Sequence, residues 1–180
     1  SCAANGHKLW NHGYYHSRPN EAQPSDGRKG AEFRGMDLAF QQTSLQQTQD
    51  LLKKRLGVTA TTFGAPFNAT DEVTVEALKS VPDLRIWLFK ETEAATDAFV
   101  LSRINAVNIE YPVHVPDFEL FKQSFECHLD KDVLTLQGHP RSWSEDRARF
   151  EAFCQIIQYL IERGAKFTTP SAYVAQTQSA

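Results

Sequence analysis

Strand-like and helix-like segments alternate along this chain, and the alternation limits the folds it can adopt. Short runs of β-branched and aromatic residues are followed by segments whose apolar residues recur at helical spacing. Strands that alternate with helices in this way form parallel sheets with right-handed crossovers. We therefore expect an α/β fold, either an open sheet or a barrel. The expected strands are 58–63, 85–89, 107–111, 133–137 and 166–168, and helices are expected from Asp37 to Gly57, from Thr70 or Asp71 to Ser80, and after Pro116, Ser142 and Pro170.

The length of 180 residues, with 41% hydrophobic and 23% charged residues, is typical of one globular domain. We expect a single domain over residues 1–180. Residues 6–11 read as a turn that leads into a strand, with no strand and helix before them. The sequence therefore predicts that the first strand of the fold lies upstream.

Composition excludes several classes of function. The formal net charge is −3, and no basic run alternates with aromatic residues, so we expect no nucleic-acid partner. No apolar stretch approaches the about 20 residues needed to span a membrane, and the first residues lack the apolar core of a signal peptide. Cys2, Cys127 and Cys154 form no metal-finger spacing or disulfide framework. Cys154 shares the apolar face of its helix, which predicts a buried thiol.

Two imidazoles, His12 and His16, lie four residues apart just after a short apolar segment. If Tyr14 to Ser17 form a helical turn, this spacing places both rings on one face, where they can bind one metal ion. Neutral imidazole suits zinc and its first-row neighbours. The alternative is a pair of surface histidines near a turn.

Three segments are expected at the carboxyl ends of strands, where parallel α/β folds place their chemistry. They contain His12, the pair Pro66 and Phe67, and His139. We expect these segments to meet at one mouth. The alternatives are a hydrogen-bonded histidine at a helix entrance for His139 and loop packing for Pro66 and Phe67. Trp143, close to His139, is expected either to stack on a sugar ring or to pack against a helix start, and His114 is expected to be exposed.

Three motifs resemble those of the polysaccharide deacetylase family, the carbohydrate esterases of NodB-homology type. Residues 6–17 (GHKLWNHGYYHS) resemble the second motif of the family, which carries a metal-binding histidine pair. Residues 63–67 (FGAPF) resemble the third, a wall of the substrate groove, and residues 136–140 (LQGHP) resemble the fifth, which supplies a catalytic histidine. Residues 167–170 (FTTP) resemble the closing strand of the family.

The resemblance implies a distorted or incomplete (β/α) barrel and a metal-dependent hydrolase that removes acetyl groups from N- or O-acetylated carbohydrate. It implies a divalent metal, zinc first with cobalt and nickel as alternatives, held by His12 and His16. His139 would be catalytic, Pro66, Phe67 and Trp143 would contact the substrate, and the location would be extracellular or periplasmic.

Two departures from the family pattern concern one catalytic unit. The first motif, an Asp-Asp pair that supplies the third metal ligand and the general base, is absent from these residues, and Gly64 occupies the position of the arginine of the third motif. Either the chain lacks its first strand, or it is a relative that has lost or rebuilt its base. The fourth motif, an acid with a nearby tryptophan, has no match. Asp26 and Glu32 are the nearest acids that could replace the missing ligand. The alternative function is a non-catalytic carbohydrate-binding or interaction module, and the missing strand predicts self-association through the sheet edge at residues 8–11.

Overall fold

The computed structural model describes residues 6–17 and 31–178. The chain divides into two compact units, the first containing residues 1–102 and 168–180 and the second residues 103–167. The prediction of one domain that lacks its first strand stays a prediction. Each unit is described below by its own contacts.

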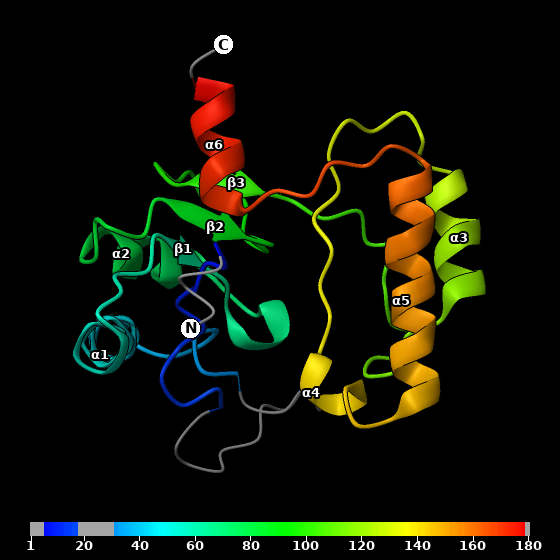
Figure 1. The fold of residues 1–180 in the computed structure, drawn as a ribbon. Helices are drawn as coiled ribbons and strands as arrows, with labels where there is room; N and C mark the ends of the chain where they lie inside the picture. Colours follow the sequence, from blue (N-terminus) through cyan, green and yellow to red (C-terminus); the bar gives the residue numbers. More distant parts are fainter. Residues whose placement is uncertain (1–5, 18–30, 179–180) are drawn as a thin grey trace. The chain divides into compact units, whose positions relative to one another are not determined.

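The first unit is built on a parallel sheet in the order β1-β2-β3 (Figure 1), which confirms the predicted parallel α/β arrangement. Its strands are β1 (Thr62–Phe63), β2 (Ile86–Leu88) and β3 (Phe99–Leu101). Asn11 extends the sheet beyond β1, because its N–H donates to the Thr62 carbonyl at 2.8 Å and its carbonyl accepts from Gly64 at 3.1 Å. Within the described residues the sheet is open. The mixed α/β fold with a parallel sheet is therefore confirmed, whereas closure into a barrel stays a prediction.

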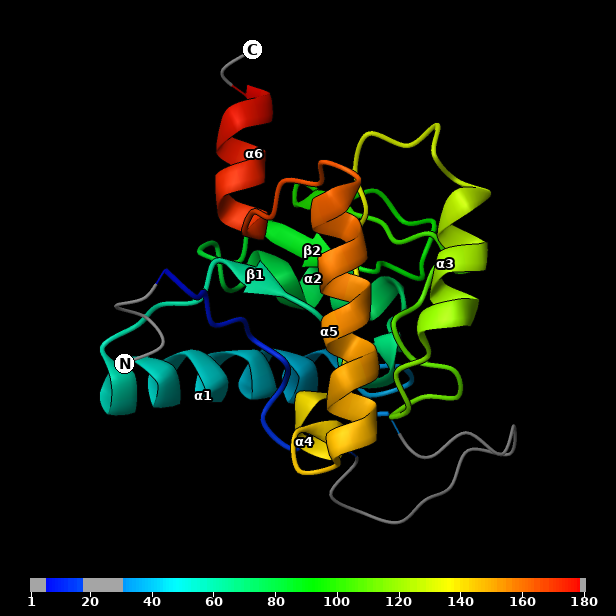
Figure 2. The same ribbon diagram turned by 45° about the vertical axis from the view of Figure 1, so that its right-hand side comes forward.

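The helices of the first unit cover both faces of this sheet (Figure 2). Side chains alternate across a strand, so Trp87 faces the core beneath α1 (Leu38–Leu56) and α2 (Glu72–Lys79), whereas its neighbours on β2 face α6 (Pro170–Gln178). The predicted caps of α1 are confirmed: the Asp37 side chain accepts from the Phe40 N–H, and Gly57 ends the helix in the left-handed region.

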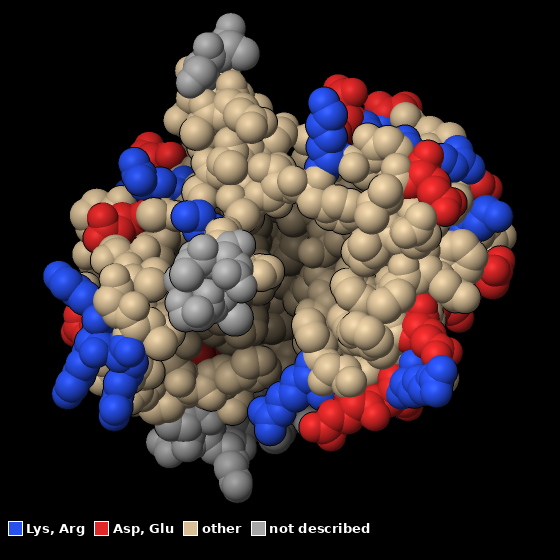
Figure 3. Space-filling model, viewed as in Figure 1, with Lys and Arg blue, Asp and Glu red and all other residues tan. Residues whose placement is uncertain are grey.

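The second unit packs α3 (Phe118–Glu126) against α5 (Arg147–Glu162), with the short α4 (Pro140–Trp143) before α5. Phe121, Ile156 and Leu160 form the centre of its core. On the face seen in Figure 3, acidic and basic side chains are interspersed over α3 and α5. No single sign of charge dominates that part of the surface.

The strands predicted at 107–111, 133–137 and 166–168 are wrong: within the second unit these segments form turns and irregular backbone. Among residues 6–17 and 31–178 no extended neighbour pairs with them, apart from one antiparallel bridge between Glu110 and Pro116. Their apolar side chains are buried nevertheless, as Val107 and Ile109 show, which is why they resemble strands in sequence.

The predicted burial of Cys154 is also wrong, because its thiol lies on an exposed face of α5.

Among the helices within the described ranges, none combines the length and apolar character that crossing a membrane requires.

Candidate functional site

The histidine pair lies in a loop that follows the Asn11 bridge, rather than in the helical turn that the spacing suggested. The ring centroids of His12 and His16 are nevertheless 5.3 Å apart. Nδ1 of His12 lies 2.6 Å from the Gly64 carbonyl oxygen. Because a carbonyl oxygen only accepts hydrogen bonds, Nδ1 is the donor, and Nε2 keeps the lone pair that can bind a metal. The backbone after β1 thus fixes the tautomer of one predicted ligand.

A buried carboxylate, that of Glu32, shapes this loop. It accepts hydrogen bonds from the backbone N–H groups of Tyr14 (2.7 Å), Tyr15 (3.0 Å) and His16 (2.6 Å), and also from the Ser44 hydroxyl. The residue has no exposed surface. Burial of a carboxylate is costly unless hydrogen bonds satisfy it, and here successive backbone donors do so. Glu32 therefore holds the segment that carries His16 in its curved conformation.

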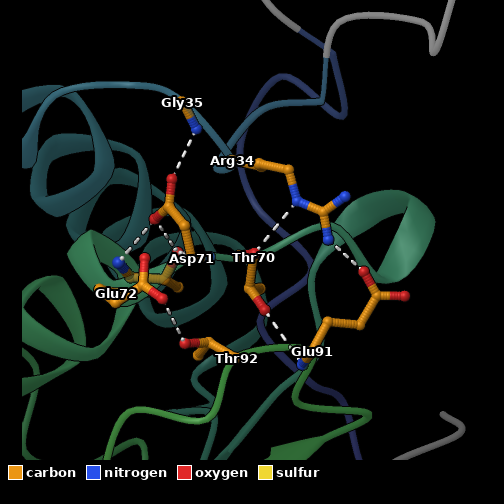
Figure 4. A network of polar contacts seen from close by, with 8 residues as sticks. Arg34, Gly35, Thr70, Asp71, Glu72, Glu91 and Thr92 are labelled. Atoms are coloured by element: carbon orange, nitrogen blue, oxygen red, sulfur yellow. Dashed lines mark hydrogen bonds and ion pairs between the residues drawn. The ribbon is translucent and has the colours of Figure 1, made fainter. Parts of the chain in front are cut away.

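The residues that follow Glu32 anchor it to the core and to the start of α2. The ring of Phe33 lies 5.1 Å from that of Phe63 in β1. Arg34 Nε donates to the Thr70 carbonyl at 3.2 Å and pairs with Glu91, as Figure 4 shows. In the same view the Gly35 N–H donates to Asp71, the N-cap of α2, at 2.6 Å. These contacts fix the direction from which the Glu32 carboxylate enters the loop.

This role bears on the search for a third metal ligand. Glu32 has no exposed surface and belongs to no group of three potential ligands with His12 and His16, so the hypothesis that Glu32 replaces the missing ligand is not supported. Asp26, the other acid considered, lies outside the described residues. Within residues 6–17 and 31–178, no acid completes a group of three with His12 and His16.

Phe67 stands beside the histidine pair, with its ring centroid 4.9 Å from that of His16. It lies in the 3-10 turn η2 (Pro66–Asn68), has a φ of 58° and is 51% exposed. A bulky residue in the left-handed region is strained, and such strain clusters at functional sites. Pro66 is buried, which leaves Phe67 as the member of this pair that a ligand can reach.

In the second unit, His139 is bonded to a second buried acid, Glu110. The side chain of Glu110 is 5% exposed, and its Oε2 lies 2.7 Å from His139 Nδ1. Its Oε1 accepts from the His139 backbone N–H at 2.6 Å and from Trp143 Nε1 at 2.7 Å. The His114 N–H donates to Oε2 at 2.8 Å. A buried carboxylate that holds Nδ1 fixes the imidazole and leaves Nε2 as its reactive nitrogen.

The pKa of Glu110 reflects two opposing effects. Burial raises it, but the hydrogen bonds from His114, His139 and Trp143 together outweigh burial and lower the pKa below the ordinary value of 4.5. Glu110 is therefore ionised at neutral pH. The ionised carboxylate faces Nδ1 of His139.

The sequence missed Glu110, and it missed the contacts of His114. His114 is exposed as expected, yet its ring centroid lies 4.6 Å from that of His139 and its Nδ1 lies 2.9 Å from Ser142 Oγ. One signal was present: Glu110 is a charged residue between the apolar Ile109 and Tyr111. Trp143 is only 2% exposed, so it acts as a hydrogen-bond donor to Glu110 and presents no ring face for stacking on a sugar.

Two of the three segments that were expected to meet lie within the first unit. His16 and Phe67 are in contact within the first unit. His139 belongs to the second unit. Its convergence with the other two segments stays a prediction.

Comparisons with known proteins support the fold. No family model matches the chain, and no curated protein matches it in sequence. One similar solved structure is that of a CE4 family pseudoenzyme from Bacillus anthracis, with a TM-score of 0.56 and 14% sequence identity. The match covers 91% of this chain and 45% of that chain, so this chain spans less than half the length of its neighbour. At this identity the likeness shows a shared polysaccharide deacetylase fold and nothing finer.

Proposed function

We propose that this chain is part of a metal-dependent hydrolase that removes acetyl groups from N- or O-acetylated carbohydrate. The observation that carries the proposal is the bond between His139 and the buried, ionised Glu110. An acid beside a tryptophan is also the fourth motif of the polysaccharide deacetylases, and Glu110 with Trp143 matches that description in space.

In the proposed reaction His139 is the general acid. Glu110 Oε2 holds Nδ1, so Nε2 donates its proton to the leaving amine or alkoxide. The Glu110 carboxylate stabilises the imidazolium before the transfer. Trp143 and two backbone N–H groups fix the carboxylate in turn.

The fold implies a divalent metal ion, and the donor atoms of the histidine pair in the first unit suit such an ion. His12 and His16 supply two neighbouring imidazoles, and the Gly64 carbonyl orients His12. When bound, a zinc, cobalt or nickel ion supplies Lewis acidity toward an acetyl carbonyl. Two imidazoles are fewer than the three protein ligands usual in catalytic zinc sites, so binding by this pair is expected to be weak.

A non-catalytic carbohydrate-binding module is the second candidate. It is favoured because no acid completes the histidine pair within the described residues and because the structural neighbour is a pseudoenzyme. The exposed rings of Trp10 and Phe67 lie beside the pair, Trp10 next to His12 and Phe67 next to His16, and such rings suit the apolar faces of sugars.

The two candidates are separated by acetate release. An acetylated chito-oligosaccharide and an aryl acetate are incubated with the chain and zinc, with wild type, His139→Ala and His128→Ala compared. His128 is a matched control, since it lies in the same unit, its Nδ1 lies 2.8 Å from the Ser124 carbonyl oxygen, and it is not part of the group of Glu110, His114 and His139. For the hydrolase, His139→Ala lowers turnover of the oligosaccharide by about 10²–10⁴-fold. Turnover of the aryl acetate falls less, because its leaving group needs no proton, and His128→Ala changes neither.

Equal losses on both substrates would show that His139 is not the acid. If no variant releases acetate with zinc or cobalt while calorimetry shows oligosaccharide binding, the binding module replaces the hydrolase. Loss of zinc stoichiometry in His12→Ala supports the metal assignment, and unchanged stoichiometry removes it.

The remaining proposals concern partners and location. A carbohydrate partner suits the fold, and the resemblance to the family suggests an extracellular or periplasmic location. Self-association through residues 8–11 is proposed because Asn11 pairs with the outer side of β1, and the backbone at the edge of a sheet can recruit a further strand.

A further inference from the structure

Three potential metal ligands gather in the second unit: Glu110, His114 and His139. One ligand atom from each lies within 4.8 Å of the other two. Within the described residues this is the group that brings three such side chains together. A set of two imidazoles and one carboxylate matches the ligands of a common class of zinc site.

Polar partners already orient both rings. His139 Nδ1 is bonded to Glu110, and His114 Nδ1 lies 2.9 Å from Ser142 Oγ. In metal sites the ligating histidines use their second nitrogen in the same way, toward a carboxylate, carbonyl or hydroxyl group. The Nε2 atoms are therefore the nitrogens left to bind an ion, with the rings 4.6 Å apart at their centroids.

The backbone also holds His114 toward the group. Its φ of 78° lies in the left-handed region, which is uncommon for histidine, and the N–H bond to Glu110 Oε2 at 2.8 Å stabilises it there. An ordinary extended backbone would point the ring elsewhere. Glu110 thus fixes His139 through its side chain and His114 through its main chain.

Access and spacing suit an ion from solution. His114 is exposed and the His139 side chain is 39% exposed, while Glu110 supplies negative charge from beneath. Tetrahedral zinc with bonds of about 2.1 Å separates its ligand atoms by about 3.4 Å. Atoms that lie within 4.8 Å of one another reach this spacing by a small movement of the side chains. Rotation of the exposed His114 ring provides such a movement without disturbing the core.

We propose that Glu110, His114 and His139 form a zinc-binding site within the second unit, separate from the His12 and His16 pair. Both imidazoles bind the ion, and Glu110 either binds it directly or orients His139 toward it. The ligands all come from residues 103–167, so the first unit supplies none of them. An ion on Nε2 of His139 would occupy the nitrogen that donates the proton in the proposed hydrolase reaction, so zinc at this group and proton transfer by His139 exclude each other.

The experiment removes the first pair and measures zinc at the second group. In a chain carrying His12→Ala and His16→Ala, titration with zinc chloride in competition with a chromophoric chelator is expected to show one ion per chain. Addition of His114→Asn is expected to weaken zinc binding at least about tenfold. Loss of a partner that only orients a ligand already costs about tenfold in affinity, and His114 is a ligand itself. Asparagine suits this position because it tolerates the left-handed backbone. His128→Ala on the same background serves as the matched control and retains the affinity.

A second readout covers loss of folding in the multiple variants. In the wild-type chain, copper(II) titration followed by electron paramagnetic resonance is expected to show nitrogen coupling that His114→Asn reduces and His128→Ala preserves. Absence of zinc binding in the doubly substituted chain, with its circular dichroism unchanged, overturns the proposal. So does equal affinity in the His114→Asn and His128→Ala chains.

Discussion

Gly13 and Glu32 are matched to each other: a Cβ atom added to Gly13 would lie 2.2 Å from Oε2 of Glu32. Gly13 also has a φ of 80°, which L side chains rarely adopt. The loop between the two histidines can close on the carboxylate only because this position carries no side chain. The identity of one loop residue is thus set by an acid 19 positions further along the chain.

Gly13→Ala tests this relationship, with Gly57→Ala as its control. Gly57 also has a positive φ, 66°, but no atom lies within 4 Å of its added Cβ. The backbone cost alone, about 1–2 kcal/mol, should therefore appear in Gly57→Ala. Gly13→Ala should lose more than that in urea unfolding, and it should also weaken zinc binding by the histidine pair. Equal losses in the two variants would show that the carboxylate can move aside.

Glu32→Gln should destabilise the loop although it preserves shape. The amide group places a donor where the carboxylate accepts from the Tyr14 and His16 N–H groups. The unsatisfied buried donors should cost about 1–3 kcal/mol, measured by urea unfolding. Ser44→Ala removes one donor to the carboxylate and one acceptor of the Tyr14 N–H, which keeps its bond to Glu32, so its loss should be smaller. A neutral result for Glu32→Gln would mean that the carboxylate does not shape the loop.

Helix ends were predictable because their signals are local. Asp37 and Gly57 lie next to the backbone groups that they cap, so the boundaries of α1 follow from the sequence. Strands in the second unit were not predictable from their apolar patterns, because a strand also needs a neighbour to pair with. Val107 and Ile109 are buried against α3 and α5 instead.

The candidate site was predictable only in part, because some of its contacts join residues that lie far apart in the sequence. The spacing of His12 and His16 is visible in the sequence, and so is the position of His139. The acids that orient them are not visible, because the Glu110 carboxylate meets His139 across 29 residues and Trp143 across 33. Glu32 acts through backbone N–H groups, which every residue but proline has, so no residue type marks its partners.

Acid should reveal the contribution of Glu110 to stability. Its pKa is lower in the folded protein than in the unfolded chain, so the stabilisation is complete above pH of about 4.5 and is lost as the pH falls through the folded pKa. Unfolding free energies of wild type and Glu110→Gln, measured with a chelator present, should therefore differ most near neutrality and converge in acid. A difference that stays constant with pH would contradict the lowered pKa.

Self-association should depend on the edge formed by residues 8–11. Trp10 in this segment is 42% exposed. Charged residues on an edge strand oppose pairing with a second chain, so Trp10→Lys should shift the mass measured by light scattering from dimer toward monomer. A wild-type chain that remains monomeric across the micromolar range would remove the edge argument.

Trp143 and Trp87 offer a test of the hydrogen bond that fixes Glu110. Both indoles are buried, but Trp143 Nε1 donates to Glu110 at 2.7 Å, whereas Trp87 Nε1 has no acceptor among the described residues. Phenylalanine removes a similar volume at either position, so the packing losses should be comparable. Trp143→Phe should cost about 1–3 kcal/mol more than Trp87→Phe, because a bond to a charged group is lost.

Trp143→Phe should also raise the pKa of Glu110, as read from the carboxyl carbon by nuclear magnetic resonance, since one of the bonds that lower this pKa is gone. Trp87→Phe should leave that pKa in place, and an equal shift in both variants would show that burial rather than the indole bond sets it.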